Sequence, residues 1–213
     1  MTRIGHVEFL VEGRSMQLFL EGILPRLLPD GVSFQVMDLG SKQAFLKKVA
    51  ARLCGYRNWL PDNHRVVLVV DSDTDDCEAL RSQLLAKIEE SDLSVASASV
   101  GRDGQVLPRI AVEMLEAWYF GDTAALGSAY GKRFATLSKK QGLRVPDQIR
   151  DPARRLEHHL RSVPKHRAGL KKTELSRDVA EHFNIENNSS ASFVRFREGV
   201  RFIAAQIQEC HAS

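Results

Sequence analysis

The stretch RVVLVVDSDTDDCEAL, which runs from Arg65 to Leu80, decides the fold. Five consecutive aliphatic residues, Val66–Val70, are followed by four aspartates within six positions. An uninterrupted aliphatic run is typical of a strand that is covered on both faces in a parallel sheet. The aspartates then lie at the carboxyl end of this strand, where parallel α/β sheets bind their ligands. They either bind a cation there or cap the helix that follows.

Apolar residues on both sides of this strand alternate between the spacings of strands and helices. The resulting order of strands and helices predicts an α/β domain with a mainly parallel, Rossmann-like sheet that is flanked by helices. The predicted elements before residue 130 are strand 6–12, helix 14–28, strand 32–39, helix 41–54, strand 65–71, helix 75–90, strand 93–100 and a short strand at 110–112 followed by a helix.

Charge divides the chain more sharply than its net value of +3 suggests. Residues 131–172 contain 13 lysines or arginines against 3 acidic residues, whereas residues 1–130 contain 13 against 18. We therefore predict an α/β domain in residues 1–130 and a basic, mostly helical extension in residues 131–213 that packs on it. The basic block indicates a surface for polyanions, and a solvated helical face is the alternative.

The acidic residues after the strands are candidate metal ligands. Asp71 and Asp73 are two positions apart, so their side chains point the same way if the backbone stays extended. Glu12 follows another predicted strand and precedes Gly13, so its carboxylate is expected near the same edge of the sheet. Oxygen ligands suit Mg²⁺ or Mn²⁺, and such an ion supports phosphodiester chemistry. Asp75 is a candidate for a second ligand shell, although acids at a helix start are also favoured by the helix dipole.

The segments FLVEG and VVLVVDSD resemble the TOPRIM domain of topoisomerases, primases and OLD-type nucleases. The resemblance implies a TOPRIM-like fold in the first half of the chain. It also implies a metal site formed by Glu12, Asp71 and Asp73.

A wider set of segments, which includes RIAVEMLEAWYFGD, LKKTELSRDVA and NNSSASFVRF, resembles an uncharacterised bacterial family of TOPRIM-like proteins. That resemblance implies an association with ABC/OLD-type ATPases and phage defence. This sequence departs from the family pattern at Met16, where members of the family and OLD-type nucleases often carry a second acid. The alternatives are a single metal, a second metal held by Asp75 or Glu116, or weak catalysis.

Two residues of the second half are candidates for the same site. Glu116 belongs to the Glu-Ala-Trp element on which the family resemblance centres, and it is either an auxiliary metal ligand or a solvated or paired acid. Lys172 precedes a predicted helix and could stabilise negative charge that develops on a phosphate. OLD-type nucleases are thought to use such a lysine. The alternative is a solvated side chain.

Phosphate contacts position a nucleic acid without reading its sequence. The basic block supplies candidates for such contacts. They are Arg154, Arg155, Arg161, Lys165, Arg167 and Lys171.

The start of the sequence does not resemble a signal peptide, and its longest aliphatic run is too short to span a membrane. Cys54, Cys77 and Cys210 are unclustered, which is typical of reduced thiols and gives no zinc motif. We therefore expect a cytoplasmic protein. The leading prediction is an Mg²⁺- or Mn²⁺-dependent nuclease that acts on DNA or RNA. The alternatives are a non-catalytic module that binds nucleic acid or a partner ATPase, and a structural subunit of a larger complex.

Overall fold

The computed structural model describes residues 5–209 and contains one sheet of four parallel strands. Neighbouring strands follow the order β2-β1-β3-β4, and all three pairings are parallel. The predicted α/β class with a parallel sheet is confirmed. The strands are β1 (Gly5–Val11), β2 (Val32–Asp38), β3 (His64–Asp71) and β4 (Val106–Ala111).

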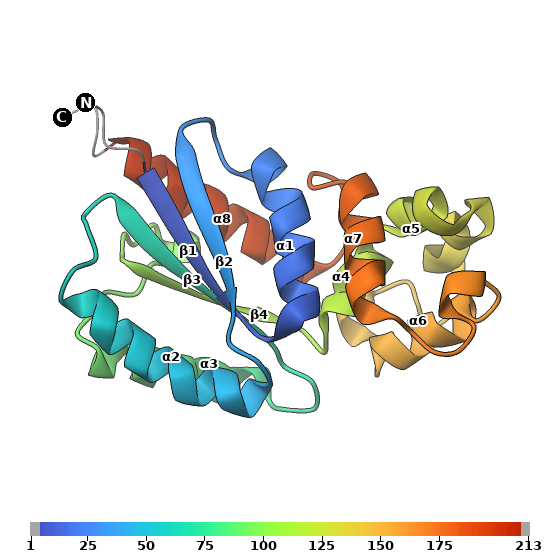
Figure 1. The fold of residues 1–213 in the computed structure, drawn as a ribbon, viewed down its shortest axis with the longest axis horizontal. Helices are drawn as coiled ribbons and strands as arrows, with labels where there is room; N and C mark the ends of the chain where they lie inside the picture. Colours follow the sequence, from blue (N-terminus) through green and yellow to red (C-terminus); the bar gives the residue numbers. More distant parts are fainter. Residues whose placement is uncertain (1–4, 210–213) are drawn as a thin grey trace.

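Helices cover both faces of the sheet (Figure 1). Helices α1 (Gly13–Leu27) and α8 (Ala191–Glu209) pack on one face, where they contribute to the larger hydrophobic cluster. Helices α2 (Lys42–Arg57) and α3 (Cys77–Glu90) pack on the other face, around the smaller cluster. The uniformly aliphatic run Val66–Val70 is fully buried between these layers, because β3 is a central strand with helices on both sides.

The prediction of a strand at residues 93–100 is wrong. In this segment only Val95 and Ser97 form isolated bridges, and Ala98–Val100 is a single 3-10 turn. The fourth strand is β4, which begins at Val106, four residues before the short strand predicted at residues 110–112, and ends at Ala111, one residue before its predicted end. Apolar residues at 93 and 95 resemble the start of a strand, but residues 96–99 are all alanine or serine and offer too little apolar surface to hold one in the sheet.

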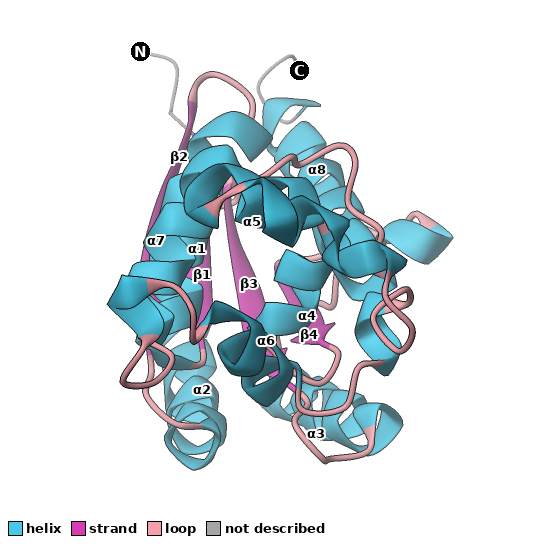
Figure 2. Ribbon diagram, turned by 90° about the vertical axis from the view of Figure 1, so that its right-hand side faces the viewer, coloured by secondary structure: helices cyan, strands magenta, loops and turns pink. Residues whose placement is uncertain are grey.

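The second half of the chain forms a group of helices beside the carboxyl ends of the strands (Figure 1). Between them lie 3-10 turns at Lys132–Lys139, Pro146–Gln148 and Pro164–His166. In Figure 2, α6 crosses in front of the carboxyl end of β3. The helices of this group are α4 (Leu115–Gly121), α5 (Thr123–Tyr130), α6 (Pro152–Leu160) and α7 (Lys172–His182).

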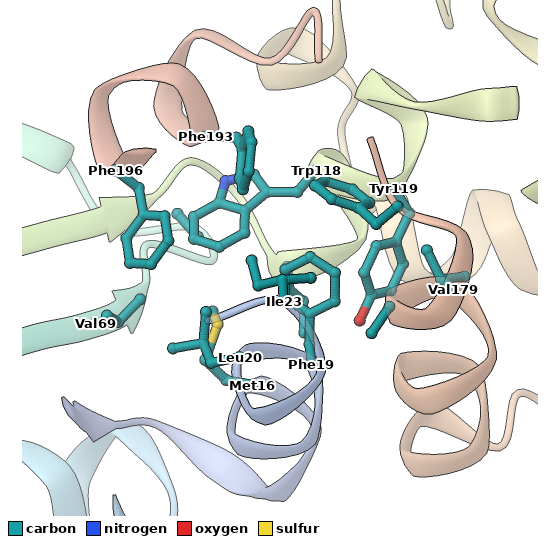
Figure 3. Close-up of a cluster of buried hydrophobic side chains, with 14 of the residues drawn as sticks. Met16, Phe19, Leu20, Ile23, Val69, Trp118, Tyr119, Val179, Phe193 and Phe196 are labelled. Carbon is teal, nitrogen blue, oxygen red and sulfur yellow. The ribbon is translucent and has the colours of Figure 1, made fainter. Parts of the chain in front are cut away.

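An aromatic cluster joins this group to the sheet layer (Figure 3). The ring of Phe19 on α1 lies 5.2 Å from that of Tyr119 and 4.9 Å from that of Phe183. Trp118 is fully buried and donates a hydrogen bond of 2.9 Å from Nε1 to Oγ of Ser192. The extension is mostly helical, as predicted, and one hydrophobic cluster continues through both halves. The boundary at residue 130 stays a prediction.

The polar loop before α8 fixes the start of that helix. Asp147 accepts a hydrogen bond of 2.7 Å from the N–H of Ser192, and Oγ of Ser190 accepts one of 3.2 Å from the N–H of Phe193. Helix α8 then returns along the sheet, so the C-terminal segment is also part of the α/β layer.

Cys54 and Cys77 are free thiols, and Cys210 lies outside the described residues. Among residues 5–209, no helix combines the length and the apolar character that crossing a membrane requires.

Candidate active site

Three carboxylates from separate segments of the chain line one pocket of about 210 Å³ at the carboxyl ends of β1 and β3. They belong to Glu12, Asp71 and Glu116, and the ammonium group of Lys172 lies beside them. The structure therefore brings together four of the residues that the sequence proposed for one site. The position matches the edge at which parallel α/β sheets bind ligands.

Glu12 is held toward the end of β3 by the turn between β1 and α1. Gly13 adopts a φ of 81°, a left-handed conformation that glycine tolerates well. The Glu12 N–H donates to the carbonyl of Val69 at 3.0 Å, and its Oε2 accepts from the Asp71 N–H at 3.2 Å. Burial, followed by the negative charge of Asp73, raises the pKa of the Glu12 carboxyl.

Asp71 is the most perturbed acid in the pocket. Its Oδ1 is buried and has no hydrogen-bond partner within the described part of the chain. Burial is the main cause that raises its pKa well above the usual value, and the charges of Glu116, Glu12 and Asp73 add to it. The positive charge of Lys172 acts in the opposite direction but does not cancel these effects. An ionised Asp71 therefore requires further positive charge nearby.

Asp73 and Asp75 meet a lysine that the sequence analysis did not identify. Nζ of Lys42 lies 2.7 Å from Asp73 and 3.0 Å from Asp75, and it donates to the carbonyl of Ser72 at 2.8 Å. Lys42 is the first residue of α2, and its position in the sequence gives no signal of this contact. Burial alone would lower the pKa of Lys42. Its contacts with both aspartates have the larger combined effect, so the pKa of Lys42 is raised above its ordinary value.

The extended backbone assumed for Asp71 and Asp73 is not found. Asp73 has a φ of 48°, and its N–H donates to the carbonyl of Glu113 at 2.6 Å. The turn directs the Asp73 carboxylate to Lys42, so it does not line the pocket beside Asp71. Asp76 caps α3, because its Oδ1 accepts a hydrogen bond of 2.8 Å from the N–H of Ala79.

Glu116 and Lys172 form an ion pair between α4 and α7. The Glu116 side chain is only 3% exposed, and its Oε1 lies 3.2 Å from Nζ of Lys172. The Lys172 side chain is 48% exposed, so its ammonium group is also accessible from the pocket opening. Lys171 points elsewhere and pairs with Glu174 at 3.2 Å.

Within residues 5–209, no three histidine, cysteine, aspartate or glutamate side chains are already arranged to hold a metal ion. The acids are instead divided between two lysines. Lys42 shares its single positive charge between Asp73 and Asp75, Lys172 pairs with Glu116, and Asp71 keeps an unpartnered oxygen. Carboxylate oxygens that could bind a metal ion are therefore present, but they are not already arranged around one ion position.

Glu113 connects this pocket to a second, basic groove. Its N–H donates to Oγ of Ser72 at 2.8 Å, and its carbonyl accepts from Asp73. Its Oε2 accepts a hydrogen bond of 3.4 Å from the N–H of Asp151, which caps α6. Asp151 also lines the groove, so Glu113 links the groove to the turn that follows Asp71.

The basic groove has a volume of about 630 Å³ and includes Arg154 and Arg155. Neither of these arginines forms an ion pair with another described residue, and both are exposed. Lys140 and Arg150 also line the groove, although the sequence analysis did not select them. His158 and His159 lie on its wall, and their rings are 5.6 Å apart.

The other predicted phosphate contacts do not line this groove. Arg161 lies 3.7 Å from Glu157, and Lys165 lies 2.6 Å from Asp178. Arg167 is exposed in a turn, and no ion pair to it is found among residues 5–209. Charge alone could not separate these residues from the two arginines of the groove, because the separation depends on how α6 and α7 are placed.

Met16 occupies the position at which the sequence resemblance predicts a second acid. Its side chain is 2% exposed and lies between the pocket and the hydrophobic cluster, close to Leu20 and Val69 (Figure 3). Its surroundings are therefore those of a core residue.

We expect Met16→Glu to lower the free energy of unfolding by about 3–5 kcal/mol, because it buries a charge without a partner. Met16→Leu is the control and should cost less than about 1.5 kcal/mol, since it conserves volume and apolar character. Urea denaturation measures both. Equal stability of the two variants would contradict this description and would show that an acid at position 16 reaches the solvated pocket.

Comparison with known protein families finds one match, a domain of unknown function (DUF4276), which covers residues 11–201. The match includes both the carboxylate pocket and the basic groove. Comparison with curated proteins and comparison with solved structures each find no match.

Proposed function

This chain belongs to the DUF4276 family, and we propose that it is a metal-dependent nuclease that hydrolyses phosphodiester bonds in DNA or RNA. The observation that supports this proposal most strongly is the buried, unpartnered Oδ1 of Asp71 in a pocket that Glu12 and Glu116 also line. Acids crowded in this way destabilise one another unless a cation or a proton joins them. Clefts with strongly perturbed acids are candidates for functional sites.

The donors fit a hard divalent cation. All of them are carboxylate oxygens, which Mg²⁺ and Mn²⁺ prefer. Glu12, Asp71 and Glu116 would hold the ion, and Asp73 and Asp75 could join them if Lys42 moved away. When bound, such an ion would polarise a phosphoryl oxygen and lower the pKa of a water molecule.

Two side chains of the pocket have properties that suit the rest of the reaction. Glu12 is either a ligand of the ion or the general base. If its carboxylate does not bind the ion, its raised pKa makes it a stronger base than an ordinary glutamate, which suits it to accept a proton from an attacking water. Lys172 is half exposed and can place its ammonium group against the negative charge that develops on the phosphate.

The basic groove would hold the phosphate backbone of the substrate. Arg154 and Arg155 have no carboxylate partner among residues 5–209, so their charge is free to neutralise phosphates. Glu113 places this groove next to the Asp73 turn through its contact with Asp151. A strand bound along α6 would therefore lead to the carboxylate pocket.

A non-catalytic module that binds nucleic acid or a partner ATPase is the second candidate. The observation that favours it is Lys42, which already pairs with the Asp73 and Asp75 carboxylates and offsets part of their charge without a metal ion. A TOPRIM relationship, a partner ATPase, a role in phage defence and a cytoplasmic location stay predictions from the sequence.

The nuclease proposal predicts cleavage of plasmid, linear DNA or RNA in the presence of Mg²⁺ or Mn²⁺. Asp71→Asn should reduce the rate by at least about 100-fold, because it removes a charged ligand from the pocket. Asp76→Asn is the matched control, since asparagine also caps helices and this residue lies outside the pocket. Equal cleavage by wild type and Asp71→Asn would contradict the proposal, and no cleavage by wild type on any substrate would favour the binding module.

The basic groove makes a separate prediction about binding. Arg154→Met and Arg155→Met should each weaken nucleic-acid affinity and reduce the slope of log K against log salt by about 1. Fluorescence anisotropy with a labelled oligonucleotide, in the absence of divalent ions, measures both quantities. Arg177→Met is the control, because it removes an equal charge from an exposed position on α7 outside the groove. Equal salt slopes for all three variants would contradict the assignment of the groove.

A further inference from the structure

A third groove, of about 660 Å³, lies at the β4 edge of the sheet and is not used by the proposed nuclease. Its floor is the outer edge of β4, and its walls come from α3 and α8, which flank that edge in Figure 2. Its volume is within the range of pockets that bind small molecules.

Three arginines from these three elements line the groove. Arg81 belongs to α3, Arg109 to β4 and Arg195 to α8. Their side chains form no ion pair with any other residue between positions 5 and 209. Two acids, Glu78 and Glu198, also border the groove, so an excess of positive charge remains there.

Arg109 is fixed in place by backbone groups. Its Nε donates to the carbonyl of Arg195 at 3.0 Å, and its Nη1 donates to that of Pro108 at 2.8 Å. Its guanidinium lies directly on Gly199 of α8, where a Cβ would overlap Nη2. Burial, followed by the charges of Arg81 and Arg195, lowers the pKa of Arg109 to about 10. An anion in the groove would relieve this unfavourable concentration of positive charge.

The edge of β4 is poorly suited to an added strand from another protein. Pro108 has no N–H to donate, and its carbonyl is occupied by Arg109. The first part of the edge is already covered, because the N–H of Ala96 donates to the carbonyl of Val106. A charged residue and a proline at a sheet edge discourage pairing between strands.

We propose that this groove binds a small organic phosphate. The phosphate would lie among Arg81, Arg109 and Arg195. The planar guanidinium groups of Arg81 and Arg195 suit bidentate contacts with phosphate oxygens, and Arg109, held by backbone carbonyls, adds a fixed positive charge. Three arginines against two acids leave an excess of positive charge, and several guanidinium donors together suit the three oxygens of a phosphate better than a single carboxylate. The apolar or aromatic portion of the ligand would pack against Leu84 and Phe202, which form apolar parts of the walls.

Isothermal titration calorimetry with adenosine 5′-monophosphate and with phenyl phosphate tests this site. At least one of them should bind saturably, whereas adenosine, which lacks the phosphate, should not. Arg81→Met and Arg195→Met should each weaken this binding by at least about 10-fold, because each removes a charge-assisted contact from an exposed side chain. Arg102→Met removes an equal charge from an exposed arginine that does not line the groove, and it should leave binding unchanged.

Two further variants separate this groove from the other sites. Arg154→Met and Asp71→Asn should bind the phosphate ligands as wild type does, so the result does not depend on whether the protein is a nuclease. The same titration with an oligonucleotide that carries a 5′ phosphate, and with one that lacks it, shows whether the groove binds the end of a nucleic acid or only a free small molecule. The proposal is overturned if neither phosphate ligand binds, or if binding is lost in Arg154→Met and kept in Arg81→Met and Arg195→Met.

Discussion

The desolvated carboxylate of Asp71 is the constraint on which the proposed site depends. Strand β3 is a central strand whose aliphatic residues are fully buried, and it ends directly at this aspartate. Its Oδ1 has no partner among the described residues, and Glu12 and Glu116 add negative charge nearby. Folding therefore concentrates negative charge in a place where water cannot screen it fully, and a positive ion bound there lowers the free energy of the folded state.

The chain already supplies part of the positive charge. Lys172 lies 3.2 Å from Glu116, and Lys42 lies within 3.0 Å of both Asp73 and Asp75. These lysines place positive charge against three of the acids without a metal ion. They also compete with any metal for the same oxygens, so metal affinity depends on how readily the lysines move. The basic groove along α6 and the groove at β4 do not include the acids of the pocket. The competition between lysines and a metal ion therefore does not involve either groove.

The sequence predicts the parallel sheet, and it predicts Glu12 and Asp71 at one edge of that sheet, because long aliphatic runs and residues at strand ends are local signals. Glu116 is a candidate only through the resemblance of its Glu-Ala-Trp element, and Asp73, which is predicted beside Asp71, lies against Lys42 instead. The sequence also predicts a strand at residues 93–100 wrongly, since the small residues 96–99 supply too little apolar area to hold one in the sheet. It did not anticipate the left-handed turn at Asp73 or the approach of Lys42, both of which depend on the packing of α2 and the β4–α4 connection against the end of β3. The sequence likewise could not show that Arg154 and Arg155 line the basic groove whereas Lys165 does not, because this depends on how the helices are placed.

The most direct test of the account is the binding of Mn²⁺, followed by electron paramagnetic resonance without nucleic acid. Wild-type protein should bind Mn²⁺ saturably, and Asp71→Asn should weaken that binding by at least about 10-fold, the lower end of the loss expected when a charged contact is removed. Lys42→Met should strengthen it, because it leaves Asp73 and Asp75 without their internal cation. Equal Mn²⁺ affinity in wild type and Asp71→Asn, or no saturable binding in wild type and Lys42→Met alike, would contradict the claim that these acids form a cation site.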